Sequence, residues 1–144
     1  MKNLKLFTQL QASRFKAAHV LPYFSHAIYR MSTVQSDKVK IASSDKDWRF
    51  YYNTEAFEGM SFEEMAFVWA HEFMHLLRDD TRRHAEHCSV TGRDAKETKD
   101  QWADASDMVI NEELSQVRGI KLLPGAITNS NNPYGKFPSG LTTE

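Results

Sequence analysis

Apolar residues recur at roughly helical spacing along the first thirty residues of the chain. Over residues 4–20 this pattern predicts a helix. Its apolar positions include Leu6, Leu10, Ala17 and Val20. Proline at position 22 interrupts the pattern and suits the first turn of a new helix. We therefore predict a second helix from Pro22 to about Met31, with one face formed by Tyr23, Ala27 and Met31.

The pattern then changes to one typical of strands. Residues 38–42 alternate between polar and apolar, and residues 48–52 are rich in aromatic side chains. Residues 43–47, between them, have the composition of a turn. Together these segments predict a β-hairpin.

Two further helices are predicted in the second half of the chain. Ser61 and Glu64 have the spacing of a capping box, in which each side chain bonds the backbone N–H of the other residue. This motif predicts a helix from Phe62 to about Arg82, followed by a polar loop over residues 88–100. A last helix is predicted from Gln101 to Arg118, with Gly119 as its C-terminal cap.

The resulting fold class is α+β: a mainly helical single domain over residues 1–144, with a small β-hairpin or sheet beside the helix that starts at Phe62. Residues 125–144 are rich in proline, glycine and asparagine and predict a loop-rich tail. A length of 144 residues is enough to bury a core.

Composition limits the possible partners and compartments. Apolar residues make up 41% of the chain, which excludes a disordered protein, and the net charge of −1 indicates neither a nucleic acid nor a membrane surface as partner. The single cysteine, Cys88, cannot form an intrachain disulfide and favours a reducing compartment. Because no signal peptide or long apolar segment is evident, we predict a cytoplasmic protein.

The strongest chemical signal is the segment His71-Glu72-Phe73-Met74-His75. Histidines four residues apart in a helix project from one face, where both can bind Zn2+. Glu72 is badly placed as a third ligand but can take a proton from a metal-activated water. The alternative is a pair of exposed histidines, but the apolar residues around the motif indicate a buried helix.

A catalytic zinc usually has three protein ligands. Asp107 is the best candidate, because a carboxylate inside the apolar helix 101–118 is costly unless it is paired or metal-bound. A surface aspartate is the alternative. Asp104 and Asn111 share its stripe, and Asn111 could orient a ligand or tether the backbone. Asp79 and Asp80 should point past the metal, and we expect them to be solvated or paired with neighbouring arginines.

His84, His87 and Cys88 could suggest a second metal cluster. Their spacing matches no standard zinc pattern, and they fall where the predicted helix passes into a polar loop. We interpret them as solvated loop residues.

The motifs resemble a metallopeptidase domain that precedes von Willebrand A-like domains in bacterial and phage proteins. Four stretches carry the similarity, and the first three are Leu21-Pro22, the strand Trp48–Asn53, and the block from Glu64 to His75. The most specific match is a fourth, Trp102–Asn111, which is similar to the family's W-N-x-A-x-D-x-x-I-N. The resemblance implies a zincin-like fold, His71 and His75 as ligands, Asp107 as third ligand and Glu72 as general base.

Two positions depart from the family pattern. Asp80 stands where the family often has a further histidine, and Ala103 replaces an asparagine. The von Willebrand A-like partner domain is missing and the chain ends where relatives continue. We expect either a minimal stand-alone version or a shortened form of a longer protein, with that domain or another protein as a possible partner.

We interpret the chain as a zinc-dependent peptidase, in which Glu72 deprotonates the zinc-activated water that attacks a peptide bond. The predicted strand ending in Tyr51, Tyr52 and Asn53 is the candidate for binding an extended peptide, although it could equally serve for packing. The rival hypothesis is a non-catalytic, zinc-stabilised module that binds another protein. A non-peptide substrate also fits the sequence.

Overall fold

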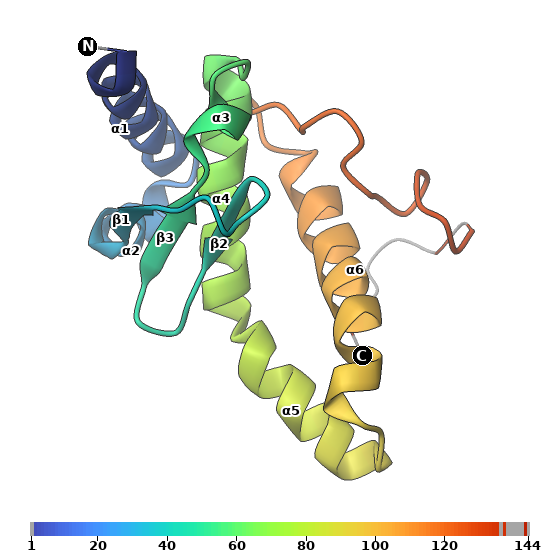
Figure 1. The fold of residues 1–144 in the computed structure, drawn as a ribbon. Coiled ribbons are helices and arrows are strands. Elements are labelled where there is room, and N and C mark those ends of the chain that lie inside the picture. The colour runs from blue at the N-terminus through green and yellow to red at the C-terminus, as the bar shows by residue number, and fades with distance from the viewer. Residues whose placement is uncertain (1, 136, 138–142, 144) are drawn as a thin grey trace.

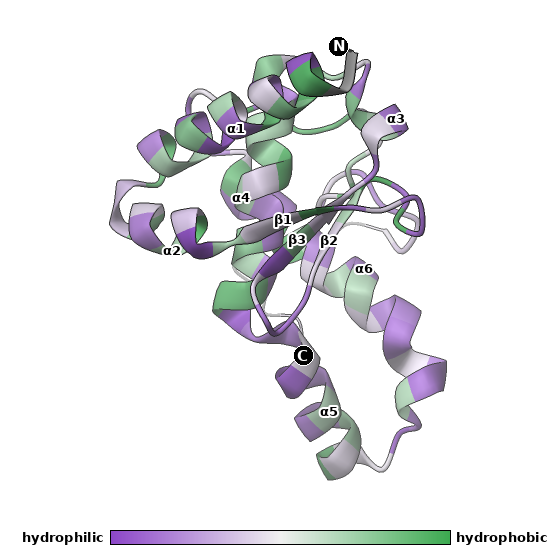
Figure 2. Ribbon diagram, turned by 60° about the vertical axis from the view of Figure 1, so that its left-hand side comes forward, coloured by the Kyte–Doolittle hydropathy of each residue, from purple (hydrophilic) through white to green (hydrophobic). Residues whose placement is uncertain are grey.

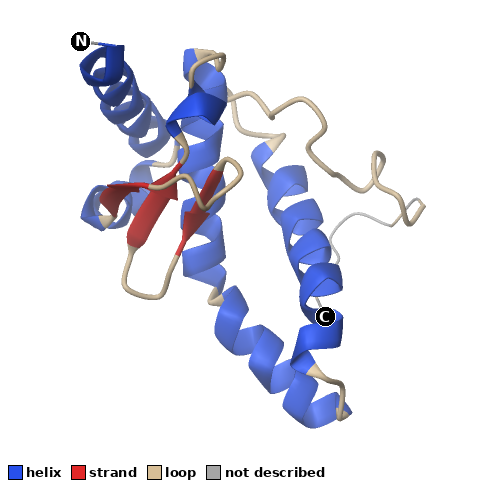
Figure 3. Cartoon of the chain, in the orientation of Figure 1, coloured by secondary structure: helices blue, strands red, loops and turns tan. Residues whose placement is uncertain are grey.

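The chain forms a mainly helical structure with one small sheet, as the α+β prediction requires (Figures 1 and 3). The computed structural model describes residues 2–135, 137 and 143. No helix among these residues combines the length and apolar character needed to cross a membrane. The elements in chain order are α1 (Lys2–Val20), a 3-10 turn (Pro22–Phe24), α2 (Ser25–Arg30), β1 (Ser32–Gln35), β2 (Ala42–Ser44), β3 (Arg49–Tyr52), α3 (Thr54–Phe57), α4 (Phe62–Arg78), α5 (Asp80–Thr91) and α6 (Ala95–Leu114).

Helix α4 is the centre of the fold: α1 and the sheet lie on one side of it and α6 on the other (Figure 1). It begins with the predicted capping box, because Ser61 Oγ accepts from Glu64 N at 3.2 Å and Glu64 Oε2 accepts from Ser61 N at 2.8 Å. Its residues from Glu64 to Ala70 are all buried. This burial fixes the start of α4 and places the His71–His75 motif at its second half.

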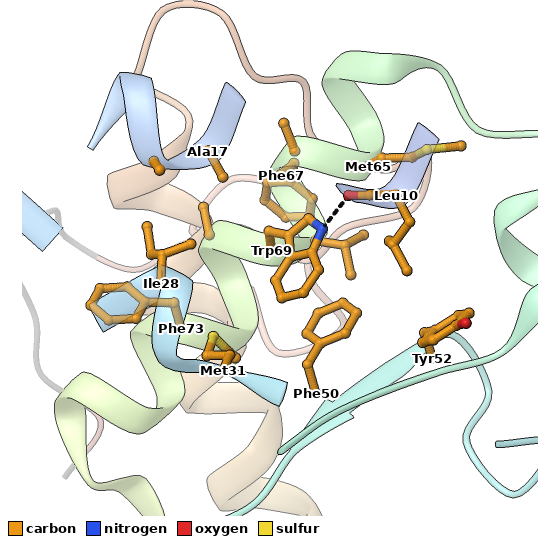
Figure 4. Packing of buried hydrophobic residues seen from close by; sticks show 14 of the residues in the cluster. Leu10, Ala17, Ile28, Met31, Phe50, Tyr52, Met65, Phe67, Trp69 and Phe73 are labelled. Atoms are coloured by element: carbon orange, nitrogen blue, oxygen red, sulfur yellow. Dashed lines mark hydrogen bonds between the residues drawn. The ribbon is translucent and has the colours of Figure 1, made fainter. Parts of the chain in front are cut away.

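The core joins α1, β3 and α4 through one tryptophan. The ring of Trp69 stacks on Phe50 with 3.9 Å between centroids, and its Nε1 donates to Leu10 O at 3.0 Å (Figure 4). All three side chains are completely buried. The indole thus satisfies its polar N–H inside the core, as a buried tryptophan should.

The sheet has the strand order β1-β3-β2, with β1 parallel and β2 antiparallel to β3. The β2–β3 hairpin was predicted, but its first strand is Ala42–Ser44, and the prediction for residues 38–41 was wrong. Those residues form bends, fixed by Asn53, which bonds Val39 O and Ile41 O. Strand β1 was not predicted, because Ser32–Gln35 shows no clear alternation.

The predicted helix 62–82 is two helices. Asp79 adopts the left-handed conformation (φ 53°, ψ 46°), which ends α4 and starts α5. Helix α5 then continues to Thr91 and is ended by Gly92 at φ 70°, so the loop predicted over residues 88–100 is confined to residues 92–94. Helices α5 and α6 pack as a pair that extends from the rest of the molecule, and hydrophilic residues are frequent there (Figure 2).

Helix α6 begins earlier and ends earlier than predicted. Asp94 caps its start by accepting from Lys96 N and Glu97 N, six residues before the predicted start. The helix ends at Leu114, so Gly119 is not its cap. Gly119 instead sits at φ 94°, where an added Cβ would lie 3.1–3.2 Å from Lys16 and Val20 of α1. Glycine therefore permits this close approach of the chain to α1.

Two remaining predictions concern the helix predicted from Pro22 and the C-terminal tail. The helix predicted from Pro22 is a 3-10 turn followed by α2, and Tyr23 is 97% exposed rather than part of a buried face. Met31, which was predicted to lie on the same face as Tyr23, is buried. The described residues of the 125–144 tail contain neither helix nor strand; positions 136, 138–142 and 144 lie outside the described residues.

Candidate metal centre

Helices α4 and α6 bring His71, His75 and Asp107 to one point. The Nε2 atoms of the two histidines lie 3.0 Å apart. Asp107 Oδ1 lies 3.3 Å from His71 Nε2 and 3.0 Å from His75 Nε2. All three residues are partly buried, and their ligand atoms lie within 4.8 Å of one another, so this group could hold a metal ion.

The Nδ1 atom of each histidine, on the side of the ring away from the candidate metal position, has a hydrogen-bond partner. Asn111 Oδ1 lies 2.9 Å from His71 Nδ1, while its Nδ2 donates to Ile127 O at 2.8 Å. Asn111 therefore occupies both roles considered for it, next to a candidate ligand and on the backbone. Asp80 Oδ2 lies 2.7 Å from His75 Nδ1.

Asp80 lies in a different place from the one that its sequence position predicted. It is neither solvated nor pointing past the site, because it is buried and accepts a hydrogen bond from the Ser106 hydroxyl of α6. Its pairing with an arginine does occur, since Arg83 lies 3.5 Å away. Asp79 is the exposed member of the pair and bonds Arg82 at 2.5 Å.

Charge is concentrated at the site. Burial alone would lower the pKa of His75, but hydrogen bonds with Asp107 and Asp80 outweigh it and raise the pKa to about 10. Burial would likewise raise the pKa of Asp107, yet its bonds with His71 and His75 hold that pKa well below its usual range. The pocket thus strongly favours positive charge between these groups.

Glu72 lies next to His71 on α4. The residue is buried, yet it lines the cleft into which the candidate metal centre opens. Its carboxylate has no hydrogen-bond or ion-pair partner among the described residues, whereas its backbone carbonyl accepts from Ser44 Oγ at 3.1 Å. That bond ties the edge of the sheet to α4. The carboxylate therefore serves no structural contact among the described residues, and its position beside the histidines on the cleft wall leaves it available for chemistry.

The site opens into a cleft of about 1230 Å³. Its walls are β2 with its flanking turns, helices α4 and α6, the start of α5, and residues 123–127. The strand beside the site is therefore β2, an edge strand, and not the predicted Tyr51–Asn53 segment. Tyr51 bonds Asp45, Tyr52 packs in the core, and Asn53 caps α3.

His84, His87 and Cys88 lie on α5 and not in a loop. His84 Nε2 lies 2.9 Å from Thr98 Oγ1, and both histidine rings pack on Trp102 of α6. Among the described residues, the only group of three or more metal-binding side chains is the one at His71. Asp104, one turn before Asp107, accepts from Tyr134 Oη at 2.6 Å.

Comparison with known proteins assigns the chain to a family. Residues 7–136 match the model of a protein family described as "Putative metallopeptidase domain". No curated protein and no solved structure matches the chain. The matched region includes the whole of α4, α5 and α6, and with them both histidines and Asp107. Since the match extends over most of the sequence, the chain belongs to this putative metallopeptidase family.

Proposed function

We propose that this protein is a zinc-dependent peptidase in which His71, His75 and Asp107 hold the ion and Glu72 is the general base. The convergence of three ligand atoms from α4 and α6 carries this proposal. Zinc bonds of 2.0–2.1 Å arranged tetrahedrally place ligand atoms about 3.3 Å apart. The observed separations of 3.0, 3.0 and 3.3 Å fit such a donor set.

A bound zinc ion would supply a Lewis acid that polarises the scissile carbonyl and lowers the pKa of water. Glu72 would accept a proton from the attacking water at its carboxylate and return it to the leaving amine. The lack of a structural partner for this carboxylate supports the assignment. With zinc bound, Nδ1 of His71 and of His75 would donate to Asn111 Oδ1 and Asp80 Oδ2, which would leave both Nε2 lone pairs for the ion.

The edge of β2 would bind the substrate as an extended peptide. Asn53 N bonds Ile41 O and Asp45 N bonds Arg49 O, so these residues form hydrogen-bonded pairs of the antiparallel ladder. Because such pairs alternate, the backbone groups of Ala42 and Ser44 point away from β3. They are free to pair with a peptide laid along the cleft.

Cleavage of peptides tests the proposal directly. The zinc-loaded protein is incubated with a mixture of peptides of defined sequence, and new termini are identified by mass spectrometry. We expect cleavage that stops on addition of a zinc chelator and returns with added zinc. A zinc-loaded protein that cleaves no peptide, or one that cleaves equally well with the chelator present, contradicts the proposal.

Zinc affinity should depend on pH above neutrality. Because the pKa of His75 is raised to about 10, the metal-free site holds a proton that zinc must displace. We expect affinity to rise about tenfold per pH unit between pH 7 and 8.5, where an ordinary histidine would give no such slope. Titration against a competing chelator measures the zinc affinity at each pH. An affinity that does not change with pH contradicts the assignment of His75 as a ligand that is protonated before zinc binds.

The raised pKa of His75 should also make the metal-free fold less stable as the pH rises. Protonated His75 stabilises the metal-free fold fully below a pH of about 6.5, the unperturbed value. This contribution is lost as the pH rises toward the folded-state pKa of about 10. Denaturant unfolding of the metal-free protein at several pH values follows this loss.

A further inference from the structure

We propose that Asp80 is a positioning residue of the metal centre, acting through His75 and held in place by Ser106. This inference rests on the proposed zinc site but not on peptide hydrolysis. Asp80 does not reach the ion position itself; it contacts His75 Nδ1 at 2.7 Å, on the side of the ring away from Asp107.

The break between α4 and α5 is what brings Asp80 to this position. In a continuous helix, five residues at about 100° each would place Asp80 roughly 140° around the axis from His75, on a different face. The left-handed conformation of Asp79 changes the direction of the chain between them. Such a conformation is unfavourable for a residue other than glycine, although aspartate tolerates it better than most. The contact between Asp80 and His75 gives this unusual conformation a purpose.

Asp80 is built into the protein interior. Its side chain is 11% exposed, and Ser106, which donates to the same Oδ2 atom, is 1% exposed. Ser106 is the residue before Asp107 on α6. A chain of contacts therefore runs from Asp107 to His75, on to Asp80 and back to α6 at Ser106. These contacts join α4, the start of α5 and α6 to one another beside the candidate ligands.

The carboxylate also determines which nitrogen of His75 faces the ion. An ionised carboxylate only accepts hydrogen bonds, so Nδ1 of His75 must carry the proton and Nε2 is presented to the metal. Asn111 does the same for His71 with a neutral amide, whose orientation is fixed by its bond to Ile127 O. Asp80 differs from Asn111 in its charge, which strengthens its hydrogen bond with His75 Nδ1.

Zinc affinity of matched variants tests the role, measured by competition with a chromogenic chelator. We expect Asp80→Ala to weaken zinc binding about 10–100-fold, the effect usual for the partner of a ligating histidine. Asp80→Asn keeps an acceptor for Nδ1 and should recover part of the affinity, with a loss of about 3–10-fold. Asp79→Asn removes the neighbouring exposed charge, tolerates the left-handed backbone, and should bind zinc within about twofold of the unmutated chain.

A role limited to holding the helix break would lower stability and leave zinc affinity unchanged. The inference is overturned if Asp80→Ala binds zinc within about twofold of the unmutated chain, or if Asp79→Asn loses as much affinity as Asp80→Ala. If Asp80→Ala does not fold by circular dichroism, Asp80→Asn decides the matter at the same twofold limit. Absence of peptide cleavage leaves this result standing, whereas absence of zinc binding by the unmutated chain overturns both proposals.

Discussion

Replacing Asp107 with alanine is expected to weaken zinc binding by more than about 100-fold, beyond the loss usual for a residue behind a ligand. Asp107 Oδ1 is the one oxygen in the donor set and the only contribution from α6. Its removal leaves two imidazoles on one helix, which are not enough to form a catalytic zinc site. Chelator competition and metal analysis of the purified variant measure the loss.

Asp104→Ala is the matched control for this variant. Asp104 lies three residues earlier on α6, lines the same cleft and bonds Tyr134, and it has no hydrogen bond or ion pair with either histidine. The two variants lose the same charge from the same helix, so only a direct role of Asp107 separates them. Equal zinc affinities for the two would contradict the ligand set.

The centre of the fold and the two candidate ligands on α4 follow from local signals in the sequence. The Ser61–Glu64 capping box fixed the start of α4, and with it the face that carries His71 and His75. Asp107 was conspicuous because a carboxylate in an apolar helix needs a partner. Those signals are local, and a helix transmits them reliably over one or two turns.

Features that depend on one residue's backbone could not be predicted in the same way. No pattern marks Asp79 as left-handed, since most aspartates in helices are not, and the polar residues after it are also typical of loops. Missing that break also misplaced Asp80, because a straight helix would turn its side chain away from His75. The contact is recognisable only when tertiary packing on Ser106 is known.

The sheet was predicted incompletely for a related reason. Strands of three or four residues carry too few positions for alternation to identify them. The polar residues of β2 would alone favour a loop, and their pairing is decided by Phe50 and Tyr52, which bury β3 in the core. Tertiary packing of β3, and not the sequence of β2 itself, therefore decides that β2 forms a strand beside the candidate metal centre.

Glu72→Gln should separate metal binding from catalysis. Glutamine has nearly the same shape as glutamate but cannot accept a proton at neutral pH, so peptide cleavage should fall about 10²–10⁴-fold. Zinc affinity should stay within about threefold, because Glu72 is not in the donor set. The fold should remain intact, since no described side chain bonds this carboxylate. Cleavage rates and zinc titrations of the same preparation give both values.

Glu63→Gln provides the control, because it makes the same change on the same helix at an exposed position in the first turn. It should cleave and bind zinc as the unmutated chain does. Full activity in Glu72→Gln would show that another group takes the proton. A protein that binds zinc through His71 and His75 but cleaves nothing, with or without Glu72, would instead be a zinc-stabilised binding module. The carboxylate of Glu72 argues against that outcome, because it lines the cleft beside both histidines and bonds no described side chain, and a purely structural zinc site would have no use for it.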